Sequence, residues 1–348
     1  MRSLDALFAQ MKDLSPAELQ LVADSILAKL KSSPRTHDAP SKPACRKCGA
    51  ENAVSKYGRD AKGNQRYRCK NCGAFFTDTS YSVISHTHCD VSKWKKYIEC
   101  LLQGISLQKS SVICGISTRT AFLWRHKILS ILEQDQSNRM LGGVVELDET
   151  FFAISYKGNH KKSKNFVMPR APYKRGTDNN AQTGSRACVM CAVERNGQFY
   201  AEVLGKGQPT IAMFSHAFDS RILADSIVLS DKGVGVRHYF ERFNDIQHIM
   251  LAAVANPAKK FGPPEIKGAF HIQNVNNMHF RLRTFLRSYN GVSTKYLNHY
   301  VNLFVWLENH KKIEKIDYRS ELAQQIRRSC TYVSAHNIIS LPAVPCVA

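Results

Sequence analysis

A strand-forming segment that carries acidic residues places the strongest constraint on the fold of this chain. Residues 142–152 are mainly apolar and β-branched, and Asp148 lies in their midst. Such a composition favours a β-strand. A carboxylate in this setting is costly to bury unless a positive group, usually a metal ion, lies against it. Asp148 therefore predicts a cation beside this strand.

A second short apolar segment offers a partner for Asp148. Residues 226–233 end in Ser230-Asp231-Lys232-Gly233. Two strands that each place one carboxylate at the edge of a sheet can hold Mg²⁺ or Mn²⁺, because these hard ions prefer oxygen ligands. We therefore expect Asp148 and Asp231 to bind metal together. Taken alone, an aspartate at a strand end is more often a turn or cap residue.

The predicted strands and helices after residue 142 alternate as in an α/β domain. Asn196-Gly197 is a favoured two-residue turn between two of the strands. The order of three strands, a helix, a strand, a helix and a strand predicts a ribonuclease-H-like domain with a mixed sheet over residues 142–312. The segments that give this order include 142–152, 186–194, 198–204, 210–218, 226–233 and 245–253.

Four of the eleven cysteines form two Cys-x-x-Cys pairs, Cys45 with Cys48 and Cys69 with Cys72. Two such pairs at this separation can direct four thiolates to one tetrahedral Zn²⁺ ion. Because a ribbon this small folds around its metal, we expect structural zinc in a zinc ribbon over residues 45–80. Its basic and aromatic residues favour nucleic-acid contact, although zinc ribbons also bind proteins.

Residues 90–135 predict three helices separated by glycines. Gly104 and Gly115 each end an apolar helical pattern, and Ser117 is a typical N-cap for the third helix. A short helix, a glycine turn and a further helix are the layout of a helix-turn-helix domain, which would place the start of the third helix in a major groove. A plain three-helix bundle is the alternative.

The sequences at the two ends of the chain predict short segments outside the domains described above. Residues 1–31 predict a helical hairpin for packing or self-association, since Ser15-Pro16-Ala17-Glu18 is a helix start. The proline-containing residues 32–44 predict a linker. Residues 313–348 predict a C-terminal tail.

The net charge limits the class of partner. The chain has 49 Lys and Arg against 28 Asp and Glu, a formal charge of +21 at pH 7. This excess predicts a polyanionic partner, either nucleic acid or a membrane surface. No apolar segment approaches the ~20 residues of a membrane span, and the first residues lack the apolar core of a secretory signal. We therefore expect a cytoplasmic, nucleoid-associated protein that binds no membrane.

Basic residues mark the expected contacts with DNA. Residues 157–175 contain seven Lys or Arg and no acidic residue, which favours a loop that contacts phosphates. A solvated loop without a partner is the alternative for each of these residues. The predicted DNA contacts across the chain are Arg66, Arg68, Thr118, Arg119, Arg125, Lys161, Lys162, Lys164, Arg170, Lys174, Arg175 and Arg281.

Together, these features resemble the zinc-ribbon insertion-sequence transposases of the ISXO-like kind, over roughly residues 45–310. The resemblance implies the wider DDE class, a ribonuclease-H fold in which two Asp and usually one Glu bind two divalent ions. The motifs that carry it, besides the ribbon and the helix-turn-helix, are Leu147-Asp148-Glu149-Thr150, Leu229-Ser230-Asp231, residues 271–277 and Ser293-Thr294-Lys295-Tyr296-Leu297.

The resemblance also implies roles for single residues. By motif, Asp148 and Asp231 correspond to the two aspartates, Asn276 to the third position, where many relatives have Glu, and Lys295 to a basic residue of some branches. An Asn offers a carbonyl oxygen without charge, so the site would hold two formal negative charges where a DDE site holds three. Branches with Asn are accepted members of the family. The sequence offers three other third ligands, Glu149, Asp225 and Glu265.

The function that the resemblance implies is DNA transposition. Such an enzyme binds the ends of an insertion sequence and, with Mg²⁺ or Mn²⁺, cleaves and transfers strands by two-metal-ion phosphoryl transfer. Its partner would be double-stranded DNA of element ends and target, held by a homodimer or higher oligomer. Two alternatives stay open, a catalytically silent DNA-binding regulator or domesticated transposase, and a nuclease of the same fold that cuts without joining.

Overall fold

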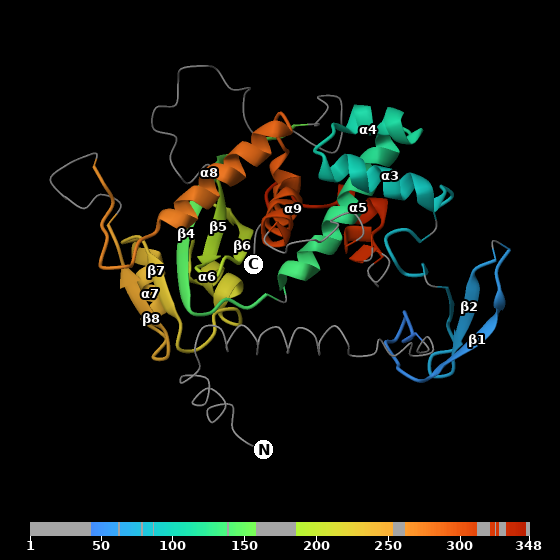
Figure 1. The fold of residues 1–348 in the computed structure, drawn as a ribbon, viewed down its shortest axis with the longest axis horizontal. Helices are drawn as coiled ribbons and strands as arrows, with labels where there is room; N and C mark the ends of the chain where they lie inside the picture. The colour runs from blue at the N-terminus through green and yellow to red at the C-terminus, as the bar shows by residue number, and fades with distance from the viewer. Residues whose placement is uncertain are drawn as a thin grey trace, which may run out of the picture. The chain divides into compact units, whose positions relative to one another are not determined.

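The computed structural model divides the chain into two compact units, 1–77 and 78–348 (Figure 1). The predicted helical hairpin, residues 32–42 of the linker and the basic segment from residue 158 onward lie outside the residues that the structure describes. The described residues are 43–61, 63–77, 79–85, 87–137, 139–157, 186–252, 262–311, 321–323, 325–326 and 332–345.

The first unit is a small antiparallel sheet. β1 (Val54–Arg59) pairs with β2 (Gln65–Cys69), which pairs with β3 (Phe75–Phe76). Each Cys-x-x-Cys turn is followed by a glycine in the left-handed region, Gly49 at φ 71° and Gly73 at φ 70°, a conformation that costs glycine little. The described apolar core of this unit is too small to stabilise it alone. Its buried members are Cys45, Val54, Cys69 and Phe76.

The second unit begins with three helices, α3 (Val91–Leu102), α4 (Leu107–Cys114) and α5 (Thr118–Ser137). Gly115 ends α4 with φ 59°, where its lack of a side chain permits the left-handed turn. Ser117 Oγ accepts a hydrogen bond of 3.0 Å from the backbone N–H of Thr120. The predicted glycine turn and the predicted N-cap of the third helix are therefore both present.

A mixed five-stranded sheet follows, in the order β6-β5-β4-β7-β8. Its strands are β4 (Val144–Ala153), β5 (Arg186–Glu194), β6 (Phe199–Lys206), β7 (Ile227–Ser230) and β8 (Gln247–Met250). β4, β5 and β6 are antiparallel neighbours, whereas β7 runs parallel to β4 and β8 parallel to β7. This order and these directions fit the ribonuclease-H-like sheet predicted from the sequence.

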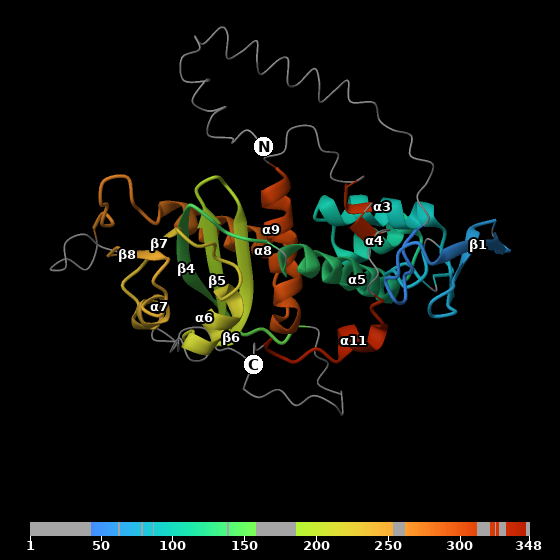
Figure 2. The same cartoon turned by 90° about the horizontal axis from the view of Figure 1, so that it is seen from below.

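Helices cover both faces of this sheet (Figures 1 and 2). α6 (Ile211–Phe218) and α7 (Val234–Phe240) pack on the face that carries Leu147. α8 (Gln273–Ser288) and α9 (Leu297–His310) pack on the other. Two further short helices of the described residues are η2 (Thr294–Tyr296), just before α9, and α11 (Ala335–Ile339). Among the described helices, none is long and apolar enough to cross a membrane.

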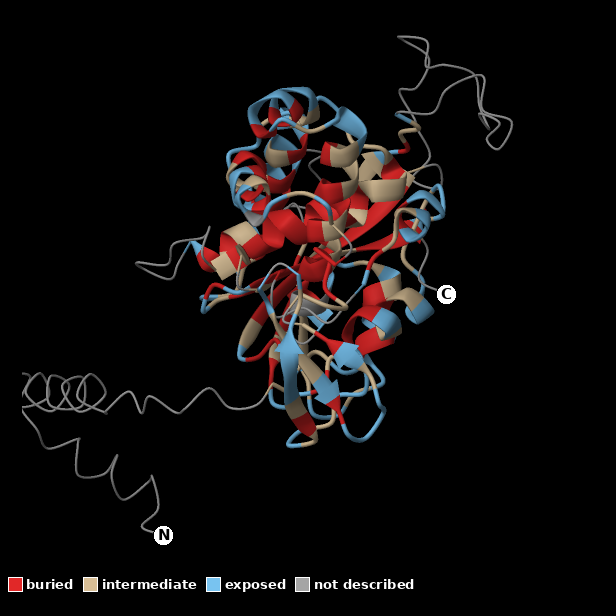
Figure 3. Ribbon diagram, turned by 90° about the vertical axis from the view of Figure 1, so that its right-hand side faces the viewer, coloured by how far each residue is buried: buried red, intermediate tan, exposed pale blue. Residues whose placement is uncertain are grey.

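The long helix α5 joins the helical segment to the sheet. Its apolar residues share one core with α9 and with the α8 face of the sheet, and the buried residues are drawn red in Figure 3. His126 Nδ1 and His299 Nδ1 lie 2.9 Å apart in this core. Burial lowers the pKa of both histidines, so the neutral rings can share a hydrogen bond. The helices before the predicted boundary at residues 135–142 and the sheet after it therefore share one hydrophobic core.

Candidate active site and cysteine cluster

Three carboxylates meet where β4 and β7 lie side by side. Leu147 of β4 pairs in register with Ser230, the last residue of β7. Asp148 and Asp231 each follow one member of this pair, so the two predicted ligands come together. Oxygen atoms of Asp148, Glu149 and Asp231 lie within 4.8 Å of one another. One divalent cation could contact all three side chains.

The crowding of these carboxylates has an electrostatic cost. Burial, together with the charges of Glu149 and Asp231, raises the pKa of Asp148 to about 7. Burial and the charge of Asp231 also raise the pKa of Glu149. Like charges in a partly buried site favour protonation unless a cation neutralises them. This all-oxygen donor set therefore fits a hard divalent cation such as Mg²⁺ or Mn²⁺.

Asp231 is fixed by its neighbours. Its Oδ1 accepts a hydrogen bond of 3.0 Å from the backbone N–H of Gly233. A Cβ atom on Gly233 would lie only 2.9 Å from this oxygen, so the close approach requires glycine. Ser230 Oγ donates to the backbone oxygen of Asp231 and lies 2.8 Å from His248 Nε2. Sequence reasoning missed His248, which lies on β8, in register with Val228 of β7.

Sequence reasoning also missed Glu146, which attaches α8 to β4. Its carboxylate is fully buried. It accepts hydrogen bonds from the backbone N–H groups of Asn274, at 2.8 Å, and Val275, at 3.2 Å, and from Asn274 Nδ2, at 2.7 Å. Arg195 Nε lies 3.4 Å from it, and His271 Nδ1 lies 3.6 Å from it. Glu146 therefore satisfies free N–H groups at the start of α8.

α8 continues along β4 past Asp148, which lies two residues after Glu146 and so on the same face of the strand. His279 Nδ1 is 3.7 Å from Asp148 Oδ2. Arg283 Nη2 donates to Thr150 Oγ1 at 2.6 Å. Burial lowers the pKa of His279 to about 4, so this ring is neutral beside the carboxylate. Residues one turn apart on α8 thus face alternate residues of β4.

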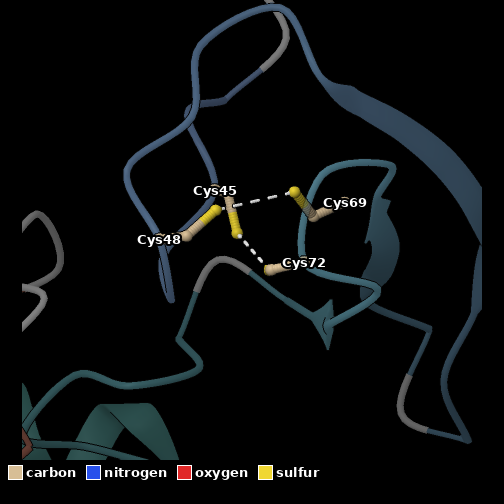
Figure 4. Close-up of side chains that lie close together, drawn as sticks. All are labelled: Cys45, Cys48, Cys69 and Cys72. Carbon is tan, nitrogen blue, oxygen red and sulfur yellow. Dashed lines mark hydrogen bonds between the residues drawn. The ribbon is translucent and has the colours of Figure 1, made fainter.

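The first unit gathers its four cysteines at one point (Figure 4). The Sγ atoms of Cys45 and Cys72 are 3.6 Å apart, and those of Cys48 and Cys69 are 3.8 Å apart. A disulfide would need about 2.05 Å. Four thiolates at ~2.3 Å from a central tetrahedral ion lie about 3.8 Å from one another. The cluster therefore has the dimensions of a four-thiolate metal site.

A known family model matches the part of the chain that holds the carboxylates. Residues 140–309 match the model of the ISXO2-like transposase domain. The chain carries an ISXO2-like transposase domain. The matched residues contain Asp148 and Asp231, the sheet and most of α9. The family resemblance identified in the sequence is confirmed.

Relatives and solved structures give more distant similarity. An uncharacterized protein in transposable element ISH50 of Halobacterium salinarum is 26% identical over 118 residues, which are 34% of this chain and 39% of that relative. The Mos1 strand transfer complex is 14% identical and covers 62% of this chain and 78% of its own, with a TM-score of 0.20. The Mos1 mariner paired end complex with Mn, also 14% identical, covers 66% and 78%, with a TM-score of 0.21. We draw no conclusion from similarities at these TM-scores.

Within the transposase domain, Asn276 lies in the first turn of α8 with an exposed side chain. It is three residues before His279, and residues at this spacing share one side of a helix. Because His279 faces Asp148, Asn276 lies on the side of α8 next to the carboxylates, one turn nearer the helix start. The role of Asn276 as the third ligand stays a prediction.

The three alternatives to Asn276 differ in position. Glu149 belongs to the carboxylate cluster. Asp225 precedes β7, at the opposite end of that strand from Asp231. Glu265 forms an ion pair of 3.1 Å with Lys232 and accepts from the backbone of residue 252. Of these alternatives, only Glu149 joins the described cluster.

Lys295 contacts the C-terminal part of the described chain. Its amine donates to the backbone oxygen of Ile339. The adjacent Thr294 exchanges two hydrogen bonds with Ser155, at 2.8 and 2.9 Å. Ser155 follows Asp148 by seven residues, on the order of 20 Å of extended chain. A role of Lys295 beside the carboxylates stays a prediction.

Two predicted DNA contacts are occupied within the fold. Arg125 is 2% exposed and donates to the backbone oxygen of Ile105 at 2.6 Å. Arg281 forms an ion pair with Glu308 and lies over the ring of Phe199. Because the guanidinium group of Arg125 is buried, it does not lie on the surface where the sequence placed a contact with the DNA backbone. Arg281 remains partly exposed, and its contact with DNA stays a prediction.

The other predicted DNA contacts are exposed, partly exposed or undescribed. Thr118 and Arg119 are exposed at the start of α5. Arg66 and Arg68 lie 5.6 and 5.5 Å from the ring centre of the exposed Phe75. The predicted contacts that lie outside the described residues are Lys161, Lys162, Lys164, Arg170, Lys174 and Arg175.

The first prediction concerns the attachment of α8. Replacing Glu146 by Gln should lower the free energy of unfolding by about 2–3 kcal/mol, because a buried acceptor of charged and backbone donors becomes an amide with donors of its own. Urea denaturation at pH 7 measures this loss. Glu241→Gln is the matched control, since Glu241 forms an exposed i,i+4 pair with Arg237 and should contribute less than about 0.5 kcal/mol. Equal effects of the two substitutions would contradict the role of Glu146.

Proposed function

We propose that this protein is a DNA transposase that binds the ends of an insertion sequence and catalyses metal-dependent cleavage and strand transfer. The observation that carries the proposal is the meeting of Asp148 and Asp231 on adjacent parallel strands inside an ISXO2-like transposase domain. The raised pKa of Asp148 supports it, because a site for divalent cations concentrates negative charge before the cations bind.

Asp148 and Asp231 would hold the divalent ions, with Asn276 or Glu149 as the third ligand. Mg²⁺ or Mn²⁺ bound there would activate the attacking oxygen and stabilise the leaving oxygen. Gly233 and Ser230 keep Asp231 in position. In this proposal, one site serves hydrolysis at an element end and then the attack of the released 3′-OH on target DNA.

The helices before the sheet would bind the DNA. α4, the turn at Gly115 and α5 have the order of a helix-turn-helix, and the exposed Thr118 and Arg119 stand where such a motif contacts a groove. Arg66 and Arg68 of the first unit, and the basic residues 161–175, would contact phosphates. A homodimer or higher oligomer would hold two element ends together.

The four-cysteine cluster would bind structural Zn²⁺ in a zinc ribbon. Its sulfur spacing fits a tetrahedral thiolate site. The backbone N–H of Lys47 donates to Cys45 Sγ at 3.4 Å, as expected where a thiolate carries negative charge. Since the described core of this unit is small, the bound ion would supply much of its stability.

The second prediction tests catalysis. Asp148→Asn and Asp231→Asn should each reduce cleavage at least ~100-fold without loss of DNA binding, because they remove charge from the metal site and leave the proposed DNA-binding helices intact. Asp225→Asn should leave cleavage unchanged, since Asp225 is exposed at the other end of β7 and Asn tolerates its φ of 60°. The measurement is cleavage and joining of duplex DNA carrying the sequences that flank the gene, with Mg²⁺ or Mn²⁺.

Two outcomes of this measurement favour the alternatives. Specific binding without metal-dependent cleavage by the wild-type protein would favour a DNA-binding regulator, for which the uncharged Asn276 would be the reason. Cleavage without joined products would favour a nuclease of the same fold. Equal activity of wild type and Asp148→Asn would remove Asp148 from the reaction.

The third prediction identifies the third ligand. Asn276→Ala should depress cleavage at least ~10-fold and leave DNA binding intact, because the amide oxygen would be lost from the metal site. Asn277→Ala, at the exposed neighbouring position, is the control and should behave as wild type. Unchanged turnover by Asn276→Ala, together with loss of Mn²⁺ binding by Glu149→Gln, would transfer the role to Glu149.

The fourth prediction concerns zinc. A variant with Cys45 and Cys48 replaced by Ser should lose its bound zinc, measured per chain by elemental analysis, and should bind element ends more weakly because the ribbon unfolds. Cys89→Ser should retain zinc, since Cys89 lies outside the cluster. Normal specific DNA binding by the zinc-free variant would show that the ribbon has another role.

A further inference from the structure

The second unit contains a pocket of about 560 Å³ beside the helices proposed to bind DNA. Its walls come from the turn between α3 and α4, from α5, and from the segment between α8 and α9. Its volume lies within the ~300–1,000 Å³ that small-ligand pockets occupy. The carboxylate cluster contributes no residue to its lining, so the pocket is separate from the candidate active site.

Aromatic rings form much of the wall. Phe122 and Tyr296 pack edge to face, with ring centres 5.4 Å apart. Tyr289 and Tyr300 also pack edge to face, with ring centres 4.7 Å apart. All four line the pocket, and Phe122, Tyr289 and Tyr296 are partly exposed. Flat apolar walls of this kind favour a flat ligand that can stack on a ring.

The charged residues that line the pocket are cationic. Arg125 and Lys157 are among them, and no Asp or Glu is. The Nε atom of Arg125 is buried and has no hydrogen-bond partner among the described residues, although its Nη2 is bonded. Lys157 donates its amine to the backbone oxygens of Asn290, at 2.7 Å, and Gly291, at 2.9 Å, which fixes this wall. A ligand with acceptor atoms would suit such a lining.

We propose that this pocket binds a single unpaired nucleotide of the DNA, with its base against the aromatic rings of the wall. A nucleobase is flat, carries acceptor atoms at its edge and remains attached to a phosphate backbone, which the basic surface would attract. A base within a paired duplex is covered by its neighbours in the stack, so only an unpaired base can enter. The inference rests on the proposed DNA-binding function and adds a ligand to it.

The test compares two DNA probes that differ in one nucleotide. One is a duplex with a single unpaired 2-aminopurine nucleotide, and the other is the same duplex without it. The wild-type protein should bind the first probe about tenfold more tightly, since stacking of one base on aromatic side chains contributes about this factor or more. The 2-aminopurine fluorescence should change on binding.

Variants locate the effect in the pocket. Ser288→Trp should abolish the preference and leave binding of the paired duplex unchanged, because Ser288 lies exposed at the pocket and a large ring there fills it without altering the core. Tyr296→Leu should have the same effect. Phe280→Leu is the matched control, since Phe280 is exposed on α8 outside the pocket, and should keep the preference.

The outcomes separate this inference from the proposed function. Equal binding of both probes by the wild type would overturn the pocket's role and leave DNA binding standing. A preference that persists in both pocket variants would also overturn it. Failure of the folded protein to bind either probe would overturn the proposed DNA-binding function, and the inference with it.

Discussion

The contact on which the candidate site depends is the burial of Glu146 against the start of α8. A fully buried carboxylate is costly unless donors surround it, and the donors here are the N–H groups of Asn274 and Val275, with Arg195 and His271 nearby. This contact fixes where α8 begins along β4. Because the helix is rigid, this contact also fixes the positions of Asn276 and His279 along β4 relative to Asp148.

The packing of α5 on α9 joins the proposed DNA-binding helices to the core that also contains α8 and the sheet. The start of α5 is exposed, whereas its later residues share a core with α9 and the sheet. The buried pair His126 and His299 favours this alignment of the two helices, because a shift would leave a buried ring nitrogen without its partner. An exposed residue such as Arg119 is thus joined through one packed core to the strands that carry the carboxylates.

Much of this arrangement could be predicted from the sequence, because it depends on local signals. The alternation of strands and helices gave the sheet, the turn residues gave the hairpin at Asn196-Gly197, and the strand ends brought Asp148 to Asp231. The roles of Glu146, Arg125 and Lys295 depend on partners distant in the chain, so composition and spacing did not reveal them. Arg125 in particular has the charge of a DNA contact and the position of a core residue.

The charge of the carboxylate cluster bears on the uncharged Asn276. Three carboxylates, Asp148, Glu149 and Asp231, already lie within reach of one another, and burial and their mutual repulsion raise the pKa of Asp148 to about 7. A fourth carboxylate at position 276 would increase this repulsion and favour protonation further. A neutral amide adds an oxygen without adding charge. With Glu149 beside Asp148, the described cluster therefore holds three carboxylates even though residue 276 is Asn.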